Sequence, residues 1–438
     1  MVILNSFNVG LLVYYLFLNI ESINGNGVGI FYLILFFMIS FFVMSYYIGK
    51  ETLYLKVSFF VLLVVFYWFS VSVFGHLNDT SILKELTIGT TGGVFLFYLI
   101  GLCLSVSFNA VFKIGVEEKY IVFYILTLLL LFILAANAVI LLNFKSNLRG
   151  DLYLLKGTTL YYQRPGDFLT ILFLIASYGF FLFKSICCFF TRPISLMLRA
   201  LVDLVYFTIF VITVFNAQVI GSNNSFLVSI MIFLITLVTA GVLSDKSLIN
   251  SYMKYDVLKV YSKKSLVLLF KKLSVYVFLA GASLPVILNI TGFDYTKIRF
   301  FQNGLSANSS ISSRIELISD NFLVQFSDSP VFGNYNIDVE TTGEGSYVHS
   351  FLLFSLTHLG FIGFLLLVVF FVLMFCSFNS RASNLFARNT LPIEMPIRLF
   401  SVNILICIFL IANLAVTFSW AVIWFSIGLL GSLVVFKK

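Results

Sequence analysis

The side chains best suited to chemistry are one histidine and two arginines in polar stretches between long apolar segments. His349 directly precedes an apolar run, and histidine, whose unperturbed pKa is about 6.5, suits general-base work near neutral pH. Arg164 and Arg314 each lie in a polar segment, and a guanidinium pairs well with phosphate oxygens. These residue types indicate a base beside a phosphate-binding site. The simpler alternatives are a histidine bonded to a neighbour and arginines that touch only lipid headgroups.

Arg164 has the most constrained setting of the three. Pro165 disfavours helical geometry in the residue before it, so Arg164 is expected to be extended. Gly166 then permits a turn, and Asp167 is expected to cap a helix that begins at Phe168. The guanidinium would be held at the membrane surface, in a fixed position for a pyrophosphate contact.

Arg164 belongs to a basic polar stretch, residues 144–167, that contains only two acidic residues. Its basic residues are Lys145, Arg149, Lys156 and Arg164. Such a concentration of positive charge predicts the binding of a polyanion such as phosphate.

Arg314 lies in a second polar stretch, residues 292–348. A surface helix is predicted over residues 312–326, because apolar residues recur there every three or four positions, at Ile315, Ile318, Phe322 and Phe326. Arg314 falls in the first turn of this helix, where a cation is unfavourable to the helix dipole. Its presence suggests a use other than helix stability, and a plain surface arginine is the alternative.

His349 and Ser350 open the next apolar run, where Gly360 and Gly363 follow. On one straight helix, His358 would lie about 13 Å deeper than His349 and on the opposite face, so the two histidines are not expected to share a site. The two glycines are interpreted as a notch for close helix packing.

The elements that position these residues are membrane helices. The chain has 438 residues, of which 60% are hydrophobic and 11% charged, and its mean hydropathy is +1.05. A soluble domain carries about 25% charged residues, so this composition excludes that class. All five cysteines lie inside or at the edges of apolar runs, without CxxC spacing, which favours neither disulfides nor a metal site.

We predict an all-α polytopic membrane protein with about 12 transmembrane helices and no separate soluble domain, so that residues 1–438 form a single transmembrane domain. The predicted spans are 6–20, 29–49, 57–75, 94–114, 120–143, 168–190, 201–220, 225–243, 268–291, 349–377, 400–417 and 418–436.

The charge distribution orients these spans. Alternate loops hold most of the 27 basic residues, which predicts that this side and both termini are cytoplasmic. Stretches 144–167 and 292–348 are then external loops, the larger one between helices nine and ten. The net charge of +8 is therefore a topology signal and gives no indication of nucleic-acid binding.

Three motifs together resemble the superfamily of O-antigen ligases (WaaL-type) and Wzy-type O-antigen polymerases. The first motif follows the pattern His-[Asn/Ser/Gln]-x9-Gly-x-x-Gly. It consists of His349-Ser350, then nine residues, then Gly360-x-x-Gly363. Arg314 followed by Pro330-Val-Phe-Gly333 is similar to the Arg-then-Pro-x-x-Gly loop of this superfamily. Arg164-Pro-Gly looks like its other functional arginine. The Arg-x10-Gly repeats of some polymerases are absent, so the resemblance leaves the ligase open.

The resemblance implies a GT-C-like, metal-independent glycosyltransferase of lipopolysaccharide biosynthesis that needs no cofactor. Its donor and acceptor would be undecaprenyl-pyrophosphate-linked glycans on the periplasmic side of the bacterial inner membrane, and a chain-length regulator would be a partner. Arg164 and Arg314 would stabilise the pyrophosphate leaving group, and His349 would act as the base. Substrate-binding residues are expected at Arg149, Lys156, Tyr162, Arg299, Tyr347 and Ser350.

Three other functions stay open. A ligase would transfer the polymer to lipid A core. A metal-dependent glycosyltransferase would need acidic ligands, for which Asp338-Val-Glu340 is the compact external pair. A lipid-linked oligosaccharide flippase or transporter would place ionisable residues near the bilayer midplane. Only Asp203 approaches that depth, and its spacing predicts a pair with Arg199 near the cytoplasmic boundary.

Overall fold

The structure of this protein is a computed structural model. The described residues are 97–98, 100–102, 104–105, 119–143, 163–189, 196–244, 285, 289, 308–334, 337–343, 346, 348–386, 394–415 and 420–431. Within them every regular element is a helix. The elements are α7 (Lys119–Asn143), α8 (Gln163–Phe189), α9 (Leu196–Ile220), α10 (Asn223–Ser244), α15 (Asn308–Asp328), α16 (Ile337–Thr341), α17 (Phe351–Phe386), α18 (Glu394–Ala415) and α19 (Ala421–Gly431).

The helices agree with a membrane protein. Among the described residues, four segments are long and apolar enough to cross a bilayer: Gly166–Cys187, Met197–Ile220, Asn223–Gly241 and Phe351–Val372. Helices α7, α9 and α10 begin and end within about five residues of their predicted bounds. Predicted spans 6–20, 29–49 and 57–75 lie outside the described residues, as do most of 94–114 and 268–291. The count of twelve stays a prediction.

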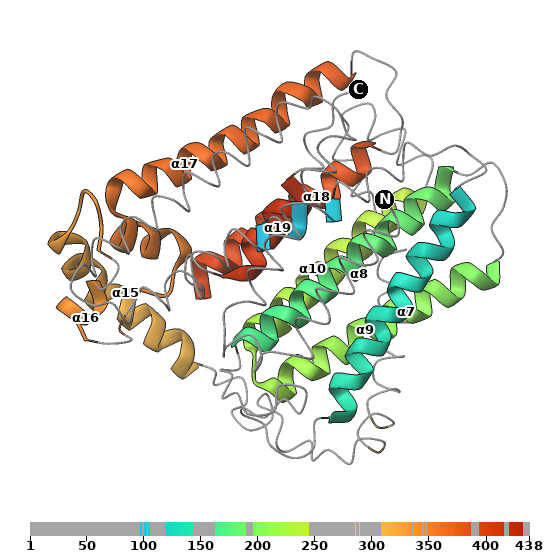
Figure 1. The fold of residues 1–438 in the computed structure, drawn as a ribbon, viewed down its shortest axis with the longest axis horizontal. Coiled ribbons are helices and arrows are strands. Elements are labelled where there is room, and N and C mark those ends of the chain that lie inside the picture. The colour runs from blue at the N-terminus through green and yellow to red at the C-terminus, as the bar shows by residue number, and fades with distance from the viewer. Residues whose placement is uncertain are drawn as a thin grey trace, which may run out of the picture.

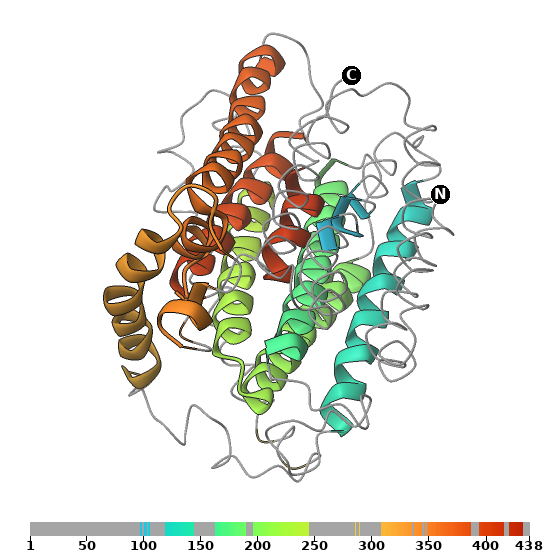
Figure 2. The same cartoon turned by 60° about the vertical axis from the view of Figure 1, so that its left-hand side comes forward.

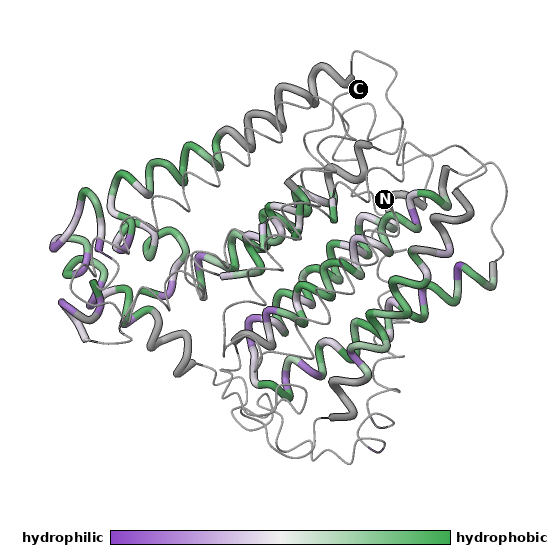
Figure 3. The backbone as a smooth tube through the Cα atoms, in the orientation of Figure 1, coloured by the Kyte–Doolittle hydropathy of each residue, from purple (hydrophilic) through white to green (hydrophobic). Residues whose placement is uncertain are grey.

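Helix α8 is the centre of the bundle, between α7, α9, α10, α18 and α19 (Figures 1 and 2). From Leu169 to Ile186 every side chain except Lys184 is buried. A helix that is apolar on all sides is stable only when other helices or lipid surround it, which explains this central place. Figure 3 shows the same apolar character along the neighbouring helices.

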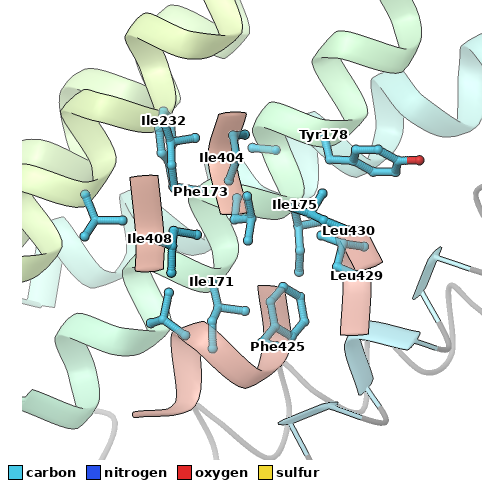
Figure 4. Packing of buried hydrophobic residues seen from close by; sticks show 14 of the residues in the cluster. Ile171, Phe173, Ile175, Tyr178, Ile232, Ile404, Ile408, Phe425, Leu429 and Leu430 are labelled. Atoms are coloured by element: carbon cyan, nitrogen blue, oxygen red, sulfur yellow. The ribbon is translucent and has the colours of Figure 1, made fainter. Parts of the chain in front are cut away.

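Large side chains fill the space around α8. Figure 4 shows Phe173 and Ile175 of α8 beside Ile404 of α18 and Leu430 of α19. Aromatic stacking joins the other side, where the rings of Phe180 and Tyr206 are 4.1 Å apart. Such offset ring pairs add roughly 1 kcal/mol beyond the area that they bury.

Two polar contacts join neighbouring helices inside the bundle. Lys184 of α8 forms an ion pair with Asp203 of α9. The predicted partner of Asp203, Arg199 on its own helix, is therefore wrong, because the packing of α8 against α9 brings the lysine ammonium to the carboxylate. In α9, Thr213 donates a hydrogen bond to the side chain of Asn137 of α7 at 3.2 Å.

The α9–α10 connection is a tight turn. The amide of Ser222 donates to Ala217 at 2.8 Å and that of Gly221 donates to Gln218 at 3.0 Å, the two bonds of a Schellman motif. Gly221 has a φ of 82°, which glycine adopts without strain. The Ser222 hydroxyl then caps α10 by accepting from the Ser225 amide at 3.4 Å.

Candidate functional site

Helix α8 begins earlier than the sequence predicts, and this changes the setting of Arg164. The helix starts at Gln163, so Arg164, Pro165 and Asp167 all lie in its first turns. The extended Arg164 and the cap at Asp167 are therefore wrong. Proline fits here because amides in the first turn have no partner inside the helix, so the missing N–H costs nothing.

Asp167 and Gly166 join the start of α8 to two other segments. The Trp420 indole N–H donates to Asp167 Oδ1 at 2.7 Å, which ties α8 to the connection between α18 and α19. A Cβ at Gly166 would lie well under 3.0 Å from the hydroxyls of Ser222 and Ser225. The start of α8 thus packs closely against the α9–α10 turn.

The start of α17 carries Ser350 and follows His349. The Ser350 hydroxyl accepts from the Leu353 amide at 3.5 Å, and Asn413 of α18 accepts from the Leu352 amide at 3.1 Å. Two of the free amides at this helix end are therefore satisfied, one by Ser350 and one by α18. Ser350, predicted to bind substrate, has a structural role as the N-cap.

The larger loop contains α15, which is longer than the predicted helix 312–326. Asn321 and Gln325, one turn apart on α15, both donate to the carbonyl of Ser346, at 2.9 and 3.1 Å. Gln325 also donates to the Thr342 hydroxyl at 2.8 Å and is fully buried. The return segment before His349 is therefore fixed to α15.

Helix α17 is broken at Gly360. Its φ and ψ are 64° and −175°, which only glycine adopts readily. The amides of Phe361 and Ile362, which lose their helical partners at the break, donate to the carbonyls of Pro330 and Val331 at 2.8 and 3.1 Å. The turn at residues 330–333 therefore supplies acceptors for two amides of the broken helix.

Two glycines make this docking possible. A Cβ at Gly360 would meet the backbone of residues 331–333 well under 3.0 Å away, and a Cβ at Gly333 would meet the backbone of residues 358–360 equally closely. The sequence predicted a close approach at Gly360. Its partner, however, is the backbone of a turn and not a neighbouring helix.

The break folds α17 back on itself, as its bend in Figure 1 also shows. Phe351 and Phe371 would be about 30 Å apart on a continuous helix. Their ring centroids are 6.2 Å apart, and both rings contact Phe409 of α18, at 6.0 and 5.1 Å. The two limbs of α17, Phe351–Leu359 and Phe361–Phe386, therefore form a V with Gly360 at its apex.

The V leaves the predicted relation between the two histidines unchanged, because both precede its apex at Gly360. The chain between them lies almost wholly in the first limb, so the two side chains are still not expected to share a site. His358 is only 3% exposed, stacks on Phe354 at 3.7 Å, and bonds through Nδ1 to Thr357 at 2.9 Å. His349 is partly exposed. His358 is thus a packed core residue, and His349 is the accessible one.

The elements that carry the three predicted catalytic residues meet at one end of the bundle. Asp167 lies three residues after Arg164 and accepts a hydrogen bond from Trp420, which directly precedes α19. Asn413, near the end of α18, accepts from the Leu352 amide at the start of α17, close to His349. Helix α15, which carries Arg314, binds Ser346 just before His349. The side chains of Arg164 and Arg314 lie outside the described residues, and their convergence on His349 stays a prediction.

The other predicted site residues lie outside the described part of the chain: Arg149, Lys156, Tyr162, Arg299 and Tyr347. Sequence reasoning missed Asn413 and Trp420, which organise this end of the bundle. A polar side chain near the end of each apolar run was the available signal, although it does not identify the partner.

The acidic pair of the alternative metal-dependent hypothesis, Asp338 and Glu340, lies in α16. Glu340 accepts a hydrogen bond from Asn334 at 2.6 Å, and the Asp338 carbonyl accepts from the Thr342 amide at 3.0 Å. Among the described residues no group of three or more His, Cys, Asp or Glu side chains could hold a metal ion.

No protein-family model, curated protein or solved structure gives a significant match to this chain. Hypotheses about its function therefore depend on its own residues and their geometry.

Proposed function

We propose that this protein is an inner-membrane glycosyltransferase that polymerises undecaprenyl-pyrophosphate-linked oligosaccharide units into O-antigen or capsule-type polysaccharide. The observation that carries the proposal is the contact between two motifs of the resemblance. Pro330-x-x-Gly333 and Gly360-x-x-Gly363 are separate in sequence, and the turn of the first accepts two hydrogen bonds from the broken helix of the second and packs against Gly360. Residues that matched only as a pattern belong to one physical unit, whose first limb begins beside His349.

The proposed reaction needs a base and a cationic site for the leaving group. His349 removes the proton from an acceptor sugar hydroxyl, and the oxygen attacks the anomeric carbon of the donor. The bond between that carbon and the pyrophosphate oxygen breaks, and its electron pair leaves with undecaprenyl pyrophosphate. Arg164 and Arg314 stabilise the charge that develops on the departing pyrophosphate. The site faces the periplasm, and both termini are cytoplasmic.

The broken helix gives no special support to a transporter. Transporters often use the free helix ends at such breaks to bind ions or substrate. Here two of the amides that the break frees, those of Phe361 and Ile362, already donate to the carbonyls of Pro330 and Val331. The break is therefore used for internal packing, and the glycosyltransferase remains the better proposal.

The glycan profile of a deletion strain tests the proposal. Loss of a polymerase should leave lipopolysaccharide capped with a single repeat unit. Accumulation of lipid-linked polymer would instead identify a ligase, and the absence of any repeat on the outer surface would favour a flippase.

Site variants then test the assigned roles in the complemented strain. His349→Ala, Arg164→Ala and Arg314→Ala should each abolish polymer while the protein is inserted at its normal level. A loss of one general base typically lowers the rate about 10²–10⁴-fold. His358→Phe, which keeps a stacked ring beside Phe354, is the matched control and should retain polymer. The reverse ranking of the two histidine variants would reject His349 as the base.

A further inference from the structure

A small apolar patch lies at the apex of the α17 V. It consists of Val331 and Phe332, in the Pro330–Gly333 turn, and Phe361 and Leu365, which follow the break. Their side chains are 50%, 64%, 54% and 49% exposed, respectively. Four large apolar side chains at one bend would be unfavourable in water, at roughly 1.5–3 kcal/mol for each side chain that could be fully buried.

The patch is continuous with one face of the second limb of α17. Phe361, Leu365, Val369 and Val372 are all exposed and follow each other at intervals of three or four residues, so they form a single stripe along the helix. Residues 361–378 contain no charged side chain, and as a helix they extend about 27 Å, close to the thickness of the hydrocarbon core. Lipid is the expected neighbour of this stripe.

The turn itself is equipped to lie beside lipid. Pro330 has no amide hydrogen, and the carbonyls of Pro330 and Val331 accept from the second limb of α17. The Gly333 amide donates to Ser329 at 3.0 Å, and the Ser329 hydroxyl donates to the Gly333 carbonyl at 3.0 Å. Non-helical backbone is tolerated next to hydrocarbon only when its polar groups are satisfied within the protein, and the hydrogen bonds named here meet that requirement for four groups of the turn.

We propose that Val331 and Phe332 insert among phospholipid acyl chains at the boundary of the bilayer and anchor the α15 loop to the membrane. The occupant of the patch is lipid, because the patch extends the lipid-facing stripe of α17 without interruption. The exposed side of α15 is mixed: Ile315, Leu323 and Val324 lie among Glu316, Ser319, Asp320, Ser327 and Asp328. Its carboxylates favour water, so Ser319, between Glu316 and Asp320, is expected outside hydrocarbon. The anchor would hold the loop at a fixed height above the bilayer whatever reaction the protein catalyses.

Site-directed spin labelling tests the anchor. Single cysteines replace Phe332, Val369 and Ser319 in a variant without the five native cysteines, and each labelled protein is reconstituted in phosphatidylethanolamine–phosphatidylglycerol vesicles. Collisions with oxygen should exceed those with a water-soluble nickel chelate at Phe332 and Val369, and the order should reverse at Ser319. A Phe332 label that behaves like the Ser319 label would overturn the proposal.

A second measurement covers failure of the cysteine-free variant to fold. A benzophenone amino acid at position 332 of the otherwise native chain should form a photoproduct with phospholipid, detected as an increase in mass, whereas the same group at position 319 should not. A covalent dimer from position 332 would show that a second copy covers the patch, and a crosslink to another protein would identify a protein partner. Either product in place of the lipid adduct would reject the lipid anchor.

Discussion

Replacing Gly360 by alanine should separate the two halves of the α17 V. The residue has a φ of 64° and a ψ of −175°, and an alanine held there costs about 1–3 kcal/mol. The added Cβ would also lie well under 3.0 Å from the backbone of Gly333, so the turn must move away. That movement stretches the bonds from Phe361 and Ile362, each of which costs about 1–3 kcal/mol when lost. Together these effects exceed roughly 3 kcal/mol.

Two other glycines provide graded controls. Gly343 also has a positive φ, 103°, but nothing lies within 4 Å of the position that a Cβ would take there, so Gly343→Ala carries only the conformational cost. Gly241, in α10, has open space and an ordinary φ, and Gly241→Ala should stabilise the helix by up to about 1 kcal/mol. The expected order of stability is therefore Gly241→Ala, wild type, Gly343→Ala and then Gly360→Ala.

A thermal assay in detergent measures this order. Each solubilised protein is heated, and the fraction that remains monodisperse is measured by size-exclusion chromatography. Gly360→Ala should also shorten or abolish polymer in cells, because the V places the first limb, and so His349, against α18. A Gly360→Ala protein as stable as Gly343→Ala would refute the reasoning, since the contact with the Pro330–Gly333 turn would then contribute nothing.

Contacts at the same end of the bundle give further predictions. Trp420→Phe removes the donor to Asp167 and should lower the free energy of unfolding by about 1–3 kcal/mol. In a double-mutant thermal assay, the protein with both Trp420→Phe and Asp167→Ala should lose less stability than the sum of the losses of the two single variants. Asn413→Ala leaves the Leu352 amide without its acceptor and should cost about 1 kcal/mol, whereas Asn413→Asp should retain most of the cap. Ser350→Ala should lower thermal stability by a similar amount, and Ser350→Thr should restore it; a polymerisation defect without any change in stability would instead support substrate binding by Ser350.

Several parts of this structure follow from local sequence. Long apolar runs form helices because a backbone in hydrocarbon must satisfy its own hydrogen bonds, and the helix predicted over 120–143 is observed as α7 over Lys119–Asn143. The surface helix over 312–326 was predicted from its spacing and is observed inside α15. The start of α8 was placed too late because a proline in the first turn was interpreted as excluding helix, although it is tolerated there.

The candidate site was predictable only as a set of residues. Local sequence is enough to predict an apolar helical chain with Arg164, Arg314 and His349 in or beside the polar stretches that separate its apolar runs, because side-chain type and periodicity are local properties. The fold of α17 at Gly360 depends on contacts with another part of the chain. Residues 351–372 contain no Asp, Glu, Lys or Arg and look like one continuous span, and the break is stable because carbonyls of Pro330 and Val331, distant in sequence, accept from two of the amides that it frees. A break in a helix requires partners from elsewhere in the chain, and the local sequence does not specify where they lie.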